Sequence, residues 1–485
     1  MAARLFTGAL VIPIVWAKIN VLDFDPSDVI NKDVAIIGGG AAGSHAAVRL
    51  RENYGKGVVV VERETTLGGH VNTYIDRETG QVHDYGVAVY FPYEDAMDFF
   101  TQVNVTTYLN PGFGNNREVY ADFTTGQTVA NYAGADAGRG FAAMKKYHDL
   151  TTEKGYDKIT QPGYFNLPPG KDIPEDLLLP LGGFVKKYAI EDLLPLMYPT
   201  TAGGIGSRGN FTQLLTLTFM KAFPTAWYKA YLGEVPMYRV EGGNQNLYTK
   251  IAAILGTDVL YESRLVETHR TDTGVELVIQ DKTGGKKLIK AKKLLMAIPP
   301  SRENIAPLDL STSESAHFNK TKYGRSHTGI VRHSRLPRNV TLRNTPLSAA
   351  ENPLSPFLKT PFVMSFSHYG GASDLFSLGV SGNDYYAFDV EAAQKTAQRN
   401  LEALADVGTI PPLGGEVLGF VAWSDHGVGG FGVSAEDMRA GWMDGMNRLQ
   451  GARSTWYTGS GIAADFTTML WKFNDEVLKR MVKTM

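Results

Sequence analysis

Three glycines in one short stretch have the types and spacing that bind a dinucleotide. The stretch VAIIGGGAAGSHAAVRL, residues 34–50, passes from apolar residues into the glycines and then into small residues at helical spacing. Gly38 would make a tight turn, Gly40 would let backbone amides approach a pyrophosphate, and Gly43 would let a helix pack closely on a strand. The pyrophosphate would then lie at the start of the helix, where unpaired amides attract an anion.

Glu62 is the acid that completes this pattern. It follows the apolar run 58–61 and stands nineteen residues after Gly43. A carboxylate at this place can accept both hydroxyls of an adenosine ribose, and its charge disfavours a 2′-phosphate. The alternative is a surface glutamate after a buried strand, but the complete strand, turn and helix pattern before it favours dinucleotide binding.

These residues need a strand, a turn and a helix in quick succession to position them. The pattern predicts a buried strand over 33–37, the glycine turn over 38–43 and a helix over 44–52. The run 58–61 is predicted to be the next strand.

The segment after Glu62 favours FAD over NAD. Gly68 and Gly69 begin six residues beyond the acid, and VHDYGVAVY, residues 82–90, follows soon after. An NAD-binding domain would normally continue with a crossover helix and further parallel strands. Glycines and polar residues instead suit a chain that wraps an extended cofactor.

A further helix is predicted near the C-terminus. Met469, Phe473, Val477 and Met481 repeat at about helical spacing, so one face of this helix should be buried. Asp465 is expected to be its N-cap. The alternative is a simple amphipathic helix with no part in binding.

The sequence at this point resembles the FAD-dependent amine oxidase superfamily, whose members carry a fingerprint, the acid and a Gly-Gly-Arg-like turn in this order. The resemblance extends through YRVEGGNQNLYTKIAAIL (238–255), LLMAIPP (294–300) and TWYTGSGIAADFTTMLWKFNDEVLKRM (455–481). It implies an α/β fold with a Rossmann-like FAD-binding domain of the glutathione reductase and amine oxidase type. An α+β substrate domain would be built from insertions.

The flavin motifs are far apart in the chain, so the FAD-binding domain must be discontinuous. We expect it to comprise residues 31–93, 236–300 and 437–485. The substrate domain would comprise residues 94–235 and 301–436, because these are the two insertions between the motifs.

Three stretches of the insertions have a predicted local structure. Alternation in FVMSFSHYGG (362–371) and NDYYAFDV (383–390) predicts strands. TAGGIGSRGN (201–210) is predicted to be a loop near the substrate. It is not a second nucleotide loop, because Pro195 and Pro199 would break the strand that such a loop needs.

The resemblance also implies which residues bind FAD. The first amides of the last helix would point at the flavin N1 and C2 carbonyl, where negative charge collects on reduction. The full set of expected cofactor-binding residues is Gly38, Gly40, Ala42, Gly43, Glu62, Arg63, Gly68, Gly69, His70, Leu265, Gly459, Phe466 and Thr467.

His70 raises the question of a covalent cofactor. The chain has no cysteine, so a tether to FAD would need another side chain. A histidine nitrogen can attach to the 8α carbon of the flavin, and the resemblance to β-cyclopiazonate-type oxidases supports such a bond. The alternative is that His70 only donates a hydrogen bond to phosphate or ribityl oxygen.

Within the superfamily the sequence resembles the fungal β-cyclopiazonate dehydrogenase type and the polyunsaturated fatty acid isomerases. The matching stretches are GGHVNTY (68–74), GGFVKKYAIEDLLPLMYPTTAGGIG (182–206) and the short terminal motif. Both groups begin with removal of hydride by flavin from an activated carbon. The resemblance therefore implies dehydrogenation or oxidative cyclisation in secondary metabolism, with redox-neutral double-bond isomerisation as the alternative and amine oxidation as the third.

No residue can be assigned as the catalytic acid or base from the sequence. His83 and Asp84 lie in the strand expected beside the flavin ring, although a buried aspartate more often pairs with backbone amides. His368 and His426 lie in predicted insertion loops from which they could reach the substrate.

Composition restricts the partners. A formal charge of −2 without a basic run gives no attraction for nucleic acid or an anionic membrane, and aromatic, sparsely charged insertions favour an apolar small molecule. His317, His327 and His333 lack the spacing of a helical zinc pair, so no metal is expected.

The first residues indicate targeting to the secretory pathway. Residues 1–17 contain Arg4, an apolar run over 5–16 and small residues where signal peptidase needs them; the alternative is a mitochondrial-like or merely hydrophobic leader. Neither this run nor any later stretch is long enough to span a membrane. N-glycosylation sequons agree with a secreted glycoprotein, although about three are expected by chance. They are at Asn104, Asn210, Asn319 and Asn339.

Overall fold

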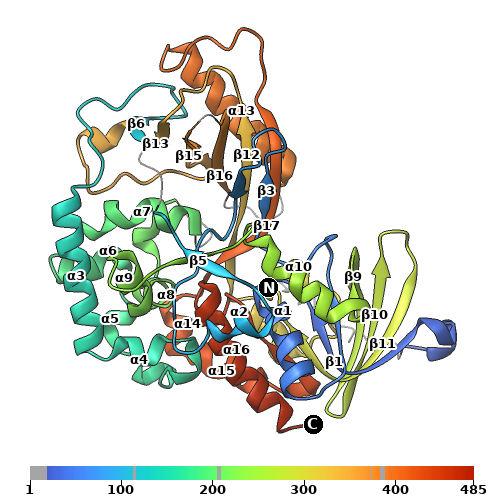
Figure 1. The fold of residues 1–485 in the computed structure, drawn as a ribbon. Coiled ribbons are helices and arrows are strands. Elements are labelled where there is room, and N and C mark those ends of the chain that lie inside the picture. Colours follow the sequence, from blue (N-terminus) through green and yellow to red (C-terminus); the bar gives the residue numbers. More distant parts are fainter. Residues whose placement is uncertain (1–18, 113–115, 205–208, 372, 383–387) are drawn as a thin grey trace, which may run out of the picture.

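Two sheets and a group of helices make up the protein (Figure 1). The predicted leader, residues 1–17, lies outside the part of the chain that the structure describes. The computed structural model describes residues 19–112, 116–204, 209–371, 373–382 and 388–485.

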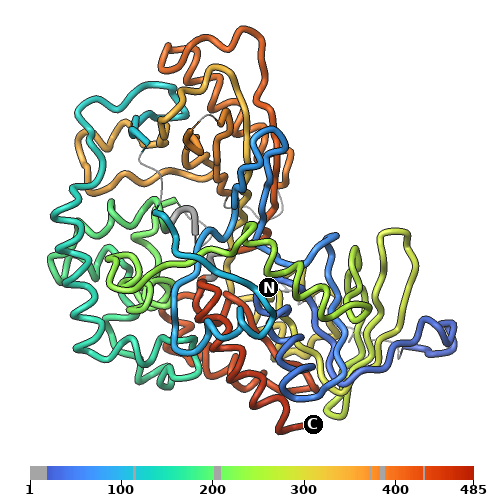
Figure 2. The backbone as a smooth tube through the Cα atoms, in the orientation of Figure 1, coloured from blue at the N-terminus to red at the C-terminus, as the bar shows by residue number. Residues whose placement is uncertain are grey.

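The first sheet joins strands from distant parts of the sequence. Its centre is β1 (Val29–Ile37), which runs parallel to β2 (Val58–Val61) on one side and to β11 (Lys286–Met296) on the other. β18 (Thr455–Tyr457) runs parallel to the end of β11. Figure 2 shows the blue, yellow-green and red segments of the chain meeting in the lower half of the molecule.

The carboxyl ends of these parallel strands are in register. Ile36 pairs with Val60 on one side and with Leu295 on the other, and Leu295 pairs in turn with Trp456. Ligands of open parallel sheets bind beyond the carboxyl ends of the strands. The register therefore places the segments that follow β1, β11 and β18 at one edge of the sheet.

The remaining strands of this sheet extend it on both sides. β8 (Val259–Leu260) is parallel to β2, while β10 (Gly274–Asp281) and β9 (Ser263–Thr271) continue from β11 as antiparallel neighbours. The sheet is therefore mixed, as the α/β fold class allows.

The first strand and helix are longer than the sequence pattern predicts. β1 begins at Val29 because it pairs with β11 from that residue onward. Helix α1 (Ala41–Val48) begins directly after Gly40 and continues as the π-helical turn η3 (Arg49–Asn53). The glycine turn is therefore shorter than the predicted 38–43.

The second sheet comes from the two insertions. Helix α13 (Val390–Asp406) covers it and buries Ala393, Ala397 and Leu401 in a separate apolar core. The strands, in order across the sheet, are β17 (Gly419–Gly432), β12 (Lys322–Arg332), β16 (Leu375–Gly382), β15 (Ser365–His368), β13 (Val340–Asn344) and β6 (Arg117–Ala121), and β14 (Phe362–Val363) pairs with β16.

One of the two predicted insertion strands is confirmed. The alternation over 362–371 corresponds to β14 and β15. Residues 383–387 lie outside the described residues, and Asp389 does not continue a strand, because its side chain caps α13 by accepting from the Ala392 amide (2.9 Å).

Helices dominate the first insertion. Except for residues 98–102, which lie beside α1, they form the group to the left of the terminal helices in Figure 1. These helices are α2 (Asp98–Gln102), α3 (Ala137–Glu153), α4 (Tyr156–Thr160), α5 (Glu175–Leu178), α6 (Leu181–Lys187), α7 (Leu193–Gly204), α8 (Thr216–Ala222) and α9 (Thr225–Tyr231).

The loop predicted over 201–210 is wrong in its first four residues, which form the end of α7. This helix continues through Pro199 although proline removes a backbone donor. Leu193, Met197 and Tyr198 are buried, and α7 packs against α3. Burial of this apolar stripe outweighs the local cost of the proline. Residues 205–208 lie outside the described residues.

The C-terminal helix α16 (Thr467–Val482) buries the predicted face, Met469, Phe473, Val477 and Met481. Among the described helices, none has the length and apolar character needed to cross a bilayer. The other elements are α10 (Gln245–Leu255), α11 (Arg302–Ile305), α12 (Thr312–Phe318), α14 (Ala435–Arg439), α15 (Trp442–Leu449), and the paired strands β3 (Thr73–Ile75) with β4 (Val82–Asp84) and β5 (Thr107–Leu109) with β7 (Tyr238–Val240).

Candidate cofactor site

The first glycine turn has the geometry that the spacing predicts. Gly38 follows β1 with a φ of +97°, and a Cβ on Gly43 would lie only 1.8 Å from the Gly38 carbonyl oxygen. Only glycine at 43 lets α1 approach the strand this closely. Gly40 is the N-cap residue of α1 and has no side chain to cap it. The first amides of this helix are therefore available to an anion.

The second glycine turn lies directly on the first. The Gly68 amide donates to the Gly39 carbonyl (3.0 Å), and a Cβ on Gly69 would lie 3.0 Å from the Gly40 Cα. Gly68 and Gly69 both have positive φ angles, of +132° and +58°. The two turns thus contact each other backbone to backbone.

Glu62 is buried beside the first turn, with 6% of its surface exposed. One carboxylate oxygen accepts from the Gly39 amide (2.7 Å) and the other from the Glu64 amide (2.9 Å). Burial raises the pKa of Glu62, and the two amides act in the opposite direction. Each carboxylate oxygen keeps a lone pair for a ribose hydroxyl. Arg63, also expected to bind cofactor, is exposed and pairs with Glu64 (3.1 Å).

Leu265 lies near this acid through the backbone. It is buried on β9, two residues after Ser263, whose amide donates to the Glu62 carbonyl (2.9 Å). The strand order therefore brings residue 265 near Glu62.

The residues that follow Gly242 and Gly243 hold the second glycine turn in place through hydrogen bonds. The Gln245 side chain donates to the Leu67 carbonyl (2.7 Å), and the Asn244 amide donates to Asp84 (2.9 Å). Asp84 also accepts from the Thr73 hydroxyl (2.6 Å). Burial raises the pKa of Asp84. The structure gives this carboxylate the role of a structural acceptor, and it is not a free base.

His83, the neighbouring candidate, is buried on β4. Its ring lies against Tyr369, with 4.4 Å between ring centroids, and its Nε2 has no hydrogen-bond partner among the described residues. Burial lowers the pKa of His83, so the ring is held neutral.

His70 and His426 form a stacked pair. Their ring centroids are 4.5 Å apart with an interplanar angle of 9°, and His70 Nε2 lies 2.7 Å from the His426 carbonyl oxygen. The prediction that His368 and His426 lie in loops is wrong. His368 ends β15 and pairs with Phe376, and His426 belongs to β17, at an irregularity of its pairing with β12. Desolvation by the surrounding protein lowers the pKa of both stacked rings. The His70 ring lowers the pKa of His426 further, whereas the hydrogen bond to the His426 carbonyl opposes the shift at His70.

This pair joins the second sheet to the second glycine turn. Asn72 donates to the Ser424 hydroxyl (3.0 Å) close to the histidines. Asp425, beside His426, is held by the guanidinium of Arg325, with Nε 3.1 Å from the carboxylate. The second sheet and the expected cofactor site are therefore in direct contact.

The last helix begins at the same edge of the first sheet. The Thr458 amide donates to the Met296 carbonyl (3.0 Å), and Gly459 follows with a φ of +114°. The prediction that Asp465 is the N-cap of α16 is wrong. Phe466 is the N-cap residue and offers no side-chain oxygen, while Asp465 pairs with Lys221 (3.7 Å).

Helices α1 and α16 are fastened together near their starts. The Trp471 ring donates to the Ala41 carbonyl (3.2 Å), and Asn474 donates to the Ala42 carbonyl (2.7 Å). Thr467 and Thr468, in the first turn of α16, are buried. The first turns of α1 and α16, neither of which has a side-chain cap, are thus held close together.

These residues fit FAD. The α1 start and the two glycine turns would hold the pyrophosphate, Glu62 would bind the adenosine ribose, and the α16 start would meet the electron-rich end of the flavin. A side chain in place of Gly43 or Gly69 would crowd the backbone that forms this cradle. Among the described residues there is no group of histidine and acidic side chains arranged to bind a metal ion.

Comparison with known proteins identifies the family. Residues 36–103 match an NAD(P)-binding Rossmann-like domain. The chain is 31% identical to a β-cyclopiazonate dehydrogenase of Aspergillus oryzae over 95% of both chains, and 29% identical to the FAD-dependent oxidoreductase oblC of Cochliobolus heterostrophus over 96% of this chain and 94% of that protein. This chain belongs to the same family of FAD-dependent oxidoreductases.

Solved structures show that this FAD-dependent oxidoreductase has an amine oxidase-type fold. A fatty acid isomerase from P. acnes superposes with a TM-score of 0.70 at 18% identity, over 93% of this chain and 98% of that one. Putrescine oxidase superposes with a TM-score of 0.56 at 15% identity, over 94% and 100%. The expected resemblance and fold class are confirmed.

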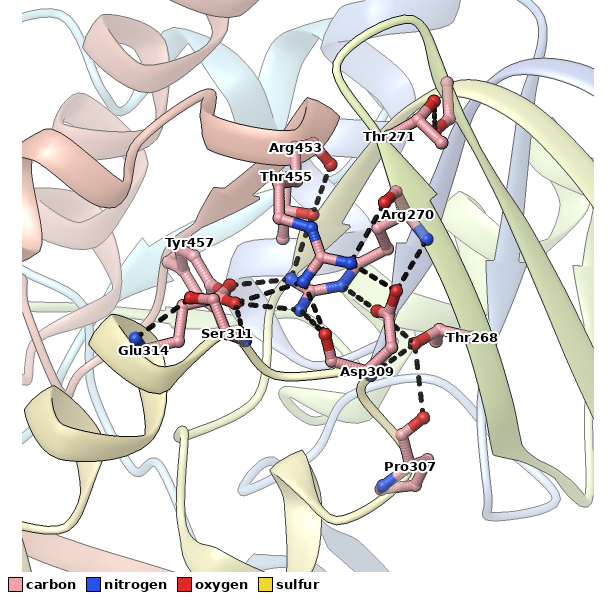
Figure 3. Close-up of polar contacts among 11 residues, drawn as sticks. Thr268, Arg270, Thr271, Pro307, Asp309, Ser311, Glu314, Arg453, Thr455 and Tyr457 are labelled. Atoms are coloured by element: carbon pink, nitrogen blue, oxygen red, sulfur yellow. Dashed lines mark hydrogen bonds and ion pairs between the residues drawn. The ribbon is translucent and has the colours of Figure 1, made fainter. Parts of the chain in front are cut away.

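One structural group of this oxidoreductase could not be read from the sequence. Arg270, whose side chain has 0% of its surface exposed, binds Asp309 (2.6 Å) and Glu314 (2.9 Å) and also contacts Thr455 (3.3 Å) (Figure 3). Arg453 pairs with the same two carboxylates. The four charges come from three separate segments, because Asp309 and Glu314 lie five residues apart, and together they fix β18, from which the Gly459 turn begins.

Proposed function

We propose that this oxidoreductase removes hydride from an activated C–H bond of an apolar substrate, as a dehydrogenase or oxidase acting in secondary metabolism. Bound FAD supplies the hydride acceptor. The observation that carries the proposal is the aromatic cluster around Phe466, the residue that precedes the first turn of α16.

The first insertion supplies most of this cluster. Measured between ring centroids, Phe466 lies 5.1 Å from Phe91 and 6.2 Å from both Phe223 and Trp227, and Trp227 stacks on Tyr231 at 4.7 Å. Phe466 and Tyr231 are only partly buried. Rings at this place favour a flat, apolar ligand, which they would hold by stacking and by exclusion of water.

The relatives support the oxidative outcome. A protein named β-cyclopiazonate dehydrogenase aligns along almost the whole chain, so both insertions have counterparts in it. The solved fatty acid isomerase has the same fold, so redox-neutral double-bond isomerisation is the second candidate function.

A test of the proposal starts from the purified full chain and its visible spectrum. Anaerobic addition of an apolar alkaloid or polyene should bleach the flavin, and air or a dye should restore the colour with formation of a product two hydrogens lighter. A product of unchanged mass with shifted double bonds would instead identify an isomerase. A coloured protein that neither is bleached by any such compound nor shifts its double bonds would contradict both.

We also propose that FAD is covalently attached through His70. The ring is exposed, neutral and held in one orientation by the stack with His426, while the His70 carbonyl accepts from the Val87 amide (3.0 Å). A neutral imidazole has the free lone pair that a bond to the 8α carbon requires.

Acid precipitation tests the attachment. The wild-type pellet should stay yellow, and the His70→Ala variant should release its flavin into the supernatant. His426→Ala keeps the attacking nitrogen but removes the ring that orients it, so we expect a mixture of bound and released flavin. A colourless wild-type pellet would refute the tether and leave the rest of the proposal intact.

A further inference from the structure

Lys221 is a buried lysine directly behind the start of α16. It lies on α8 (Thr216–Ala222) with 1% of its surface exposed, in an otherwise apolar stretch of the first insertion. Its Nζ donates to the carbonyls of Ser460 (2.6 Å) and Ala463 (2.7 Å), in the turn that links β18 to α16. The third partner is Asp465, 3.7 Å from Nζ.

The surroundings of Lys221 are arranged for a cation. An ammonium group has three donors, and here two carbonyls and one carboxylate face it. The Tyr164 ring lies 5.8 Å from Nζ and adds a further weak attraction. Burial lowers the pKa of Lys221 and raises that of Asp465, while each group stabilises the charge on the other.

The same contact explains why α16 has no acidic cap. Asp465 stands one residue before the N-cap Phe466, yet its carboxylate is directed to Lys221 and does not accept from the helix amides. The helix start therefore keeps its partial positive charge. Lys221 holds its ammonium group against the carbonyls of the turn that precedes this helix start, with Asp465 as its counterion.

We propose that Lys221 is a positioning residue that holds the turn before α16 and raises the reduction potential of the flavin. The inference rests on the proposed function, in which the flavin ring meets the start of α16. Reduction places negative charge on the ring, so positive charge fixed nearby stabilises the reduced form relative to the oxidised form. Removal of either member of the pair should then shift the potential, in opposite directions.

The experiment measures the midpoint potential of the flavin in the full chain by anaerobic titration against reference dyes at neutral pH. Lys221→Met should lower the potential. Asp465→Asn should raise it, because the cation then has no counterion. The double variant should lie between the two single variants.

Lys229→Met is the matched control, because Lys229 is exposed on α9 of the same insertion and should leave the potential unchanged. If Lys221→Met fails to retain flavin, the sign of the Asp465→Asn shift decides alone. If the salt bridge is merely structural, both variants should retain less flavin and their midpoint potentials should not shift in opposite directions. That result would overturn the inference. A wild-type chain that cannot hold FAD would overturn the proposed function as well.

Discussion

At the scale of single residues, close backbone contacts define the cofactor site more than side-chain chemistry does. Gly43 meets the Gly38 carbonyl, and Gly69 meets Gly40, at distances that a side chain could not share. Glu62 is the exception, since its carboxylate both fixes the turn and offers lone pairs to the ribose. The site is therefore sensitive to the addition of a single methyl group.

Gly43→Ala should abolish flavin retention and lower the melting temperature. Its Cβ would lie 1.8 Å from the Gly38 carbonyl oxygen, so α1 must move away from β1 and take the pyrophosphate amides with it. The measurement is the ratio of absorbance near 450 nm to that near 280 nm, together with thermal unfolding.

Gly183→Ala is the control for this prediction, because Gly183 lies within α6 with open space around its Cβ position. It should keep its flavin and gain a few tenths to about 1 kcal/mol of stability, since alanine is the better helix former. Equal flavin content in the two variants would refute the role of the close contact.

At the scale of elements, the Arg270 network anchors β18. Burial raises the pKa of Asp309 and Glu314, but hydrogen bonds and charge outweigh this effect and lower the pKa of both carboxyls below the ordinary value. The Arg270 backbone amide and guanidinium act on Asp309, and the guanidinium acts on Glu314. The contribution of the two carboxylates to stability is therefore fully present above the unfolded-state pKa of about 4. It is lost as the pH falls through the lower folded-state values.

Arg270→Met should destabilise the protein by about 3–5 kcal/mol at pH 7, because two buried carboxylates lose their main partner. This loss of stability should be smaller at pH 4. Asp309 and Glu314 can be protonated in the variant at that pH, and they then no longer bury a charge without its main partner. Urea unfolding at both pH values measures the loss. Lys395→Met, which breaks only an exposed pair with Glu391, should change stability by less than about 0.5 kcal/mol at either pH. A deficit independent of pH would contradict the ionic role.

Local patterns and long-range pairs differed in how well the sequence could predict them. The glycine turns and the buried face of α16 depend on neighbours within a few residues, so spacing alone located them. The His70 and His426 contact joins residues 356 positions apart, and Lys221 reaches a carbonyl 239 positions away. A lone lysine in an apolar stretch was the only signal of the second contact. Asp465 was misplaced as a cap because a distant lysine competes for it.

At the scale of the whole molecule, the four sequons can be compared with the surface. The four asparagines are all exposed and lie in the two insertions. They are Asn104, Asn210, Asn319 and Asn339. Exposure is the condition that a glycan requires. The four asparagines meet this condition, and entry of the chain into the secretory pathway, with residues 1–17 as the signal, stays a prediction.

Expression of the full sequence in a eukaryotic secretory host tests this proposal. The protein should be recovered from the medium, begin after residue 17 and lose mass on treatment with an endoglycosidase, because exposed sequons become accessible to the glycosylation machinery. Replacement of all four asparagines by glutamine should remove the mass change without loss of flavin, since none of the four contacts the cofactor turns. A version lacking residues 1–17 should stay in the cell and unglycosylated. Retention of the full-length chain in the cell with its leader intact would show that the leader is not a secretory signal.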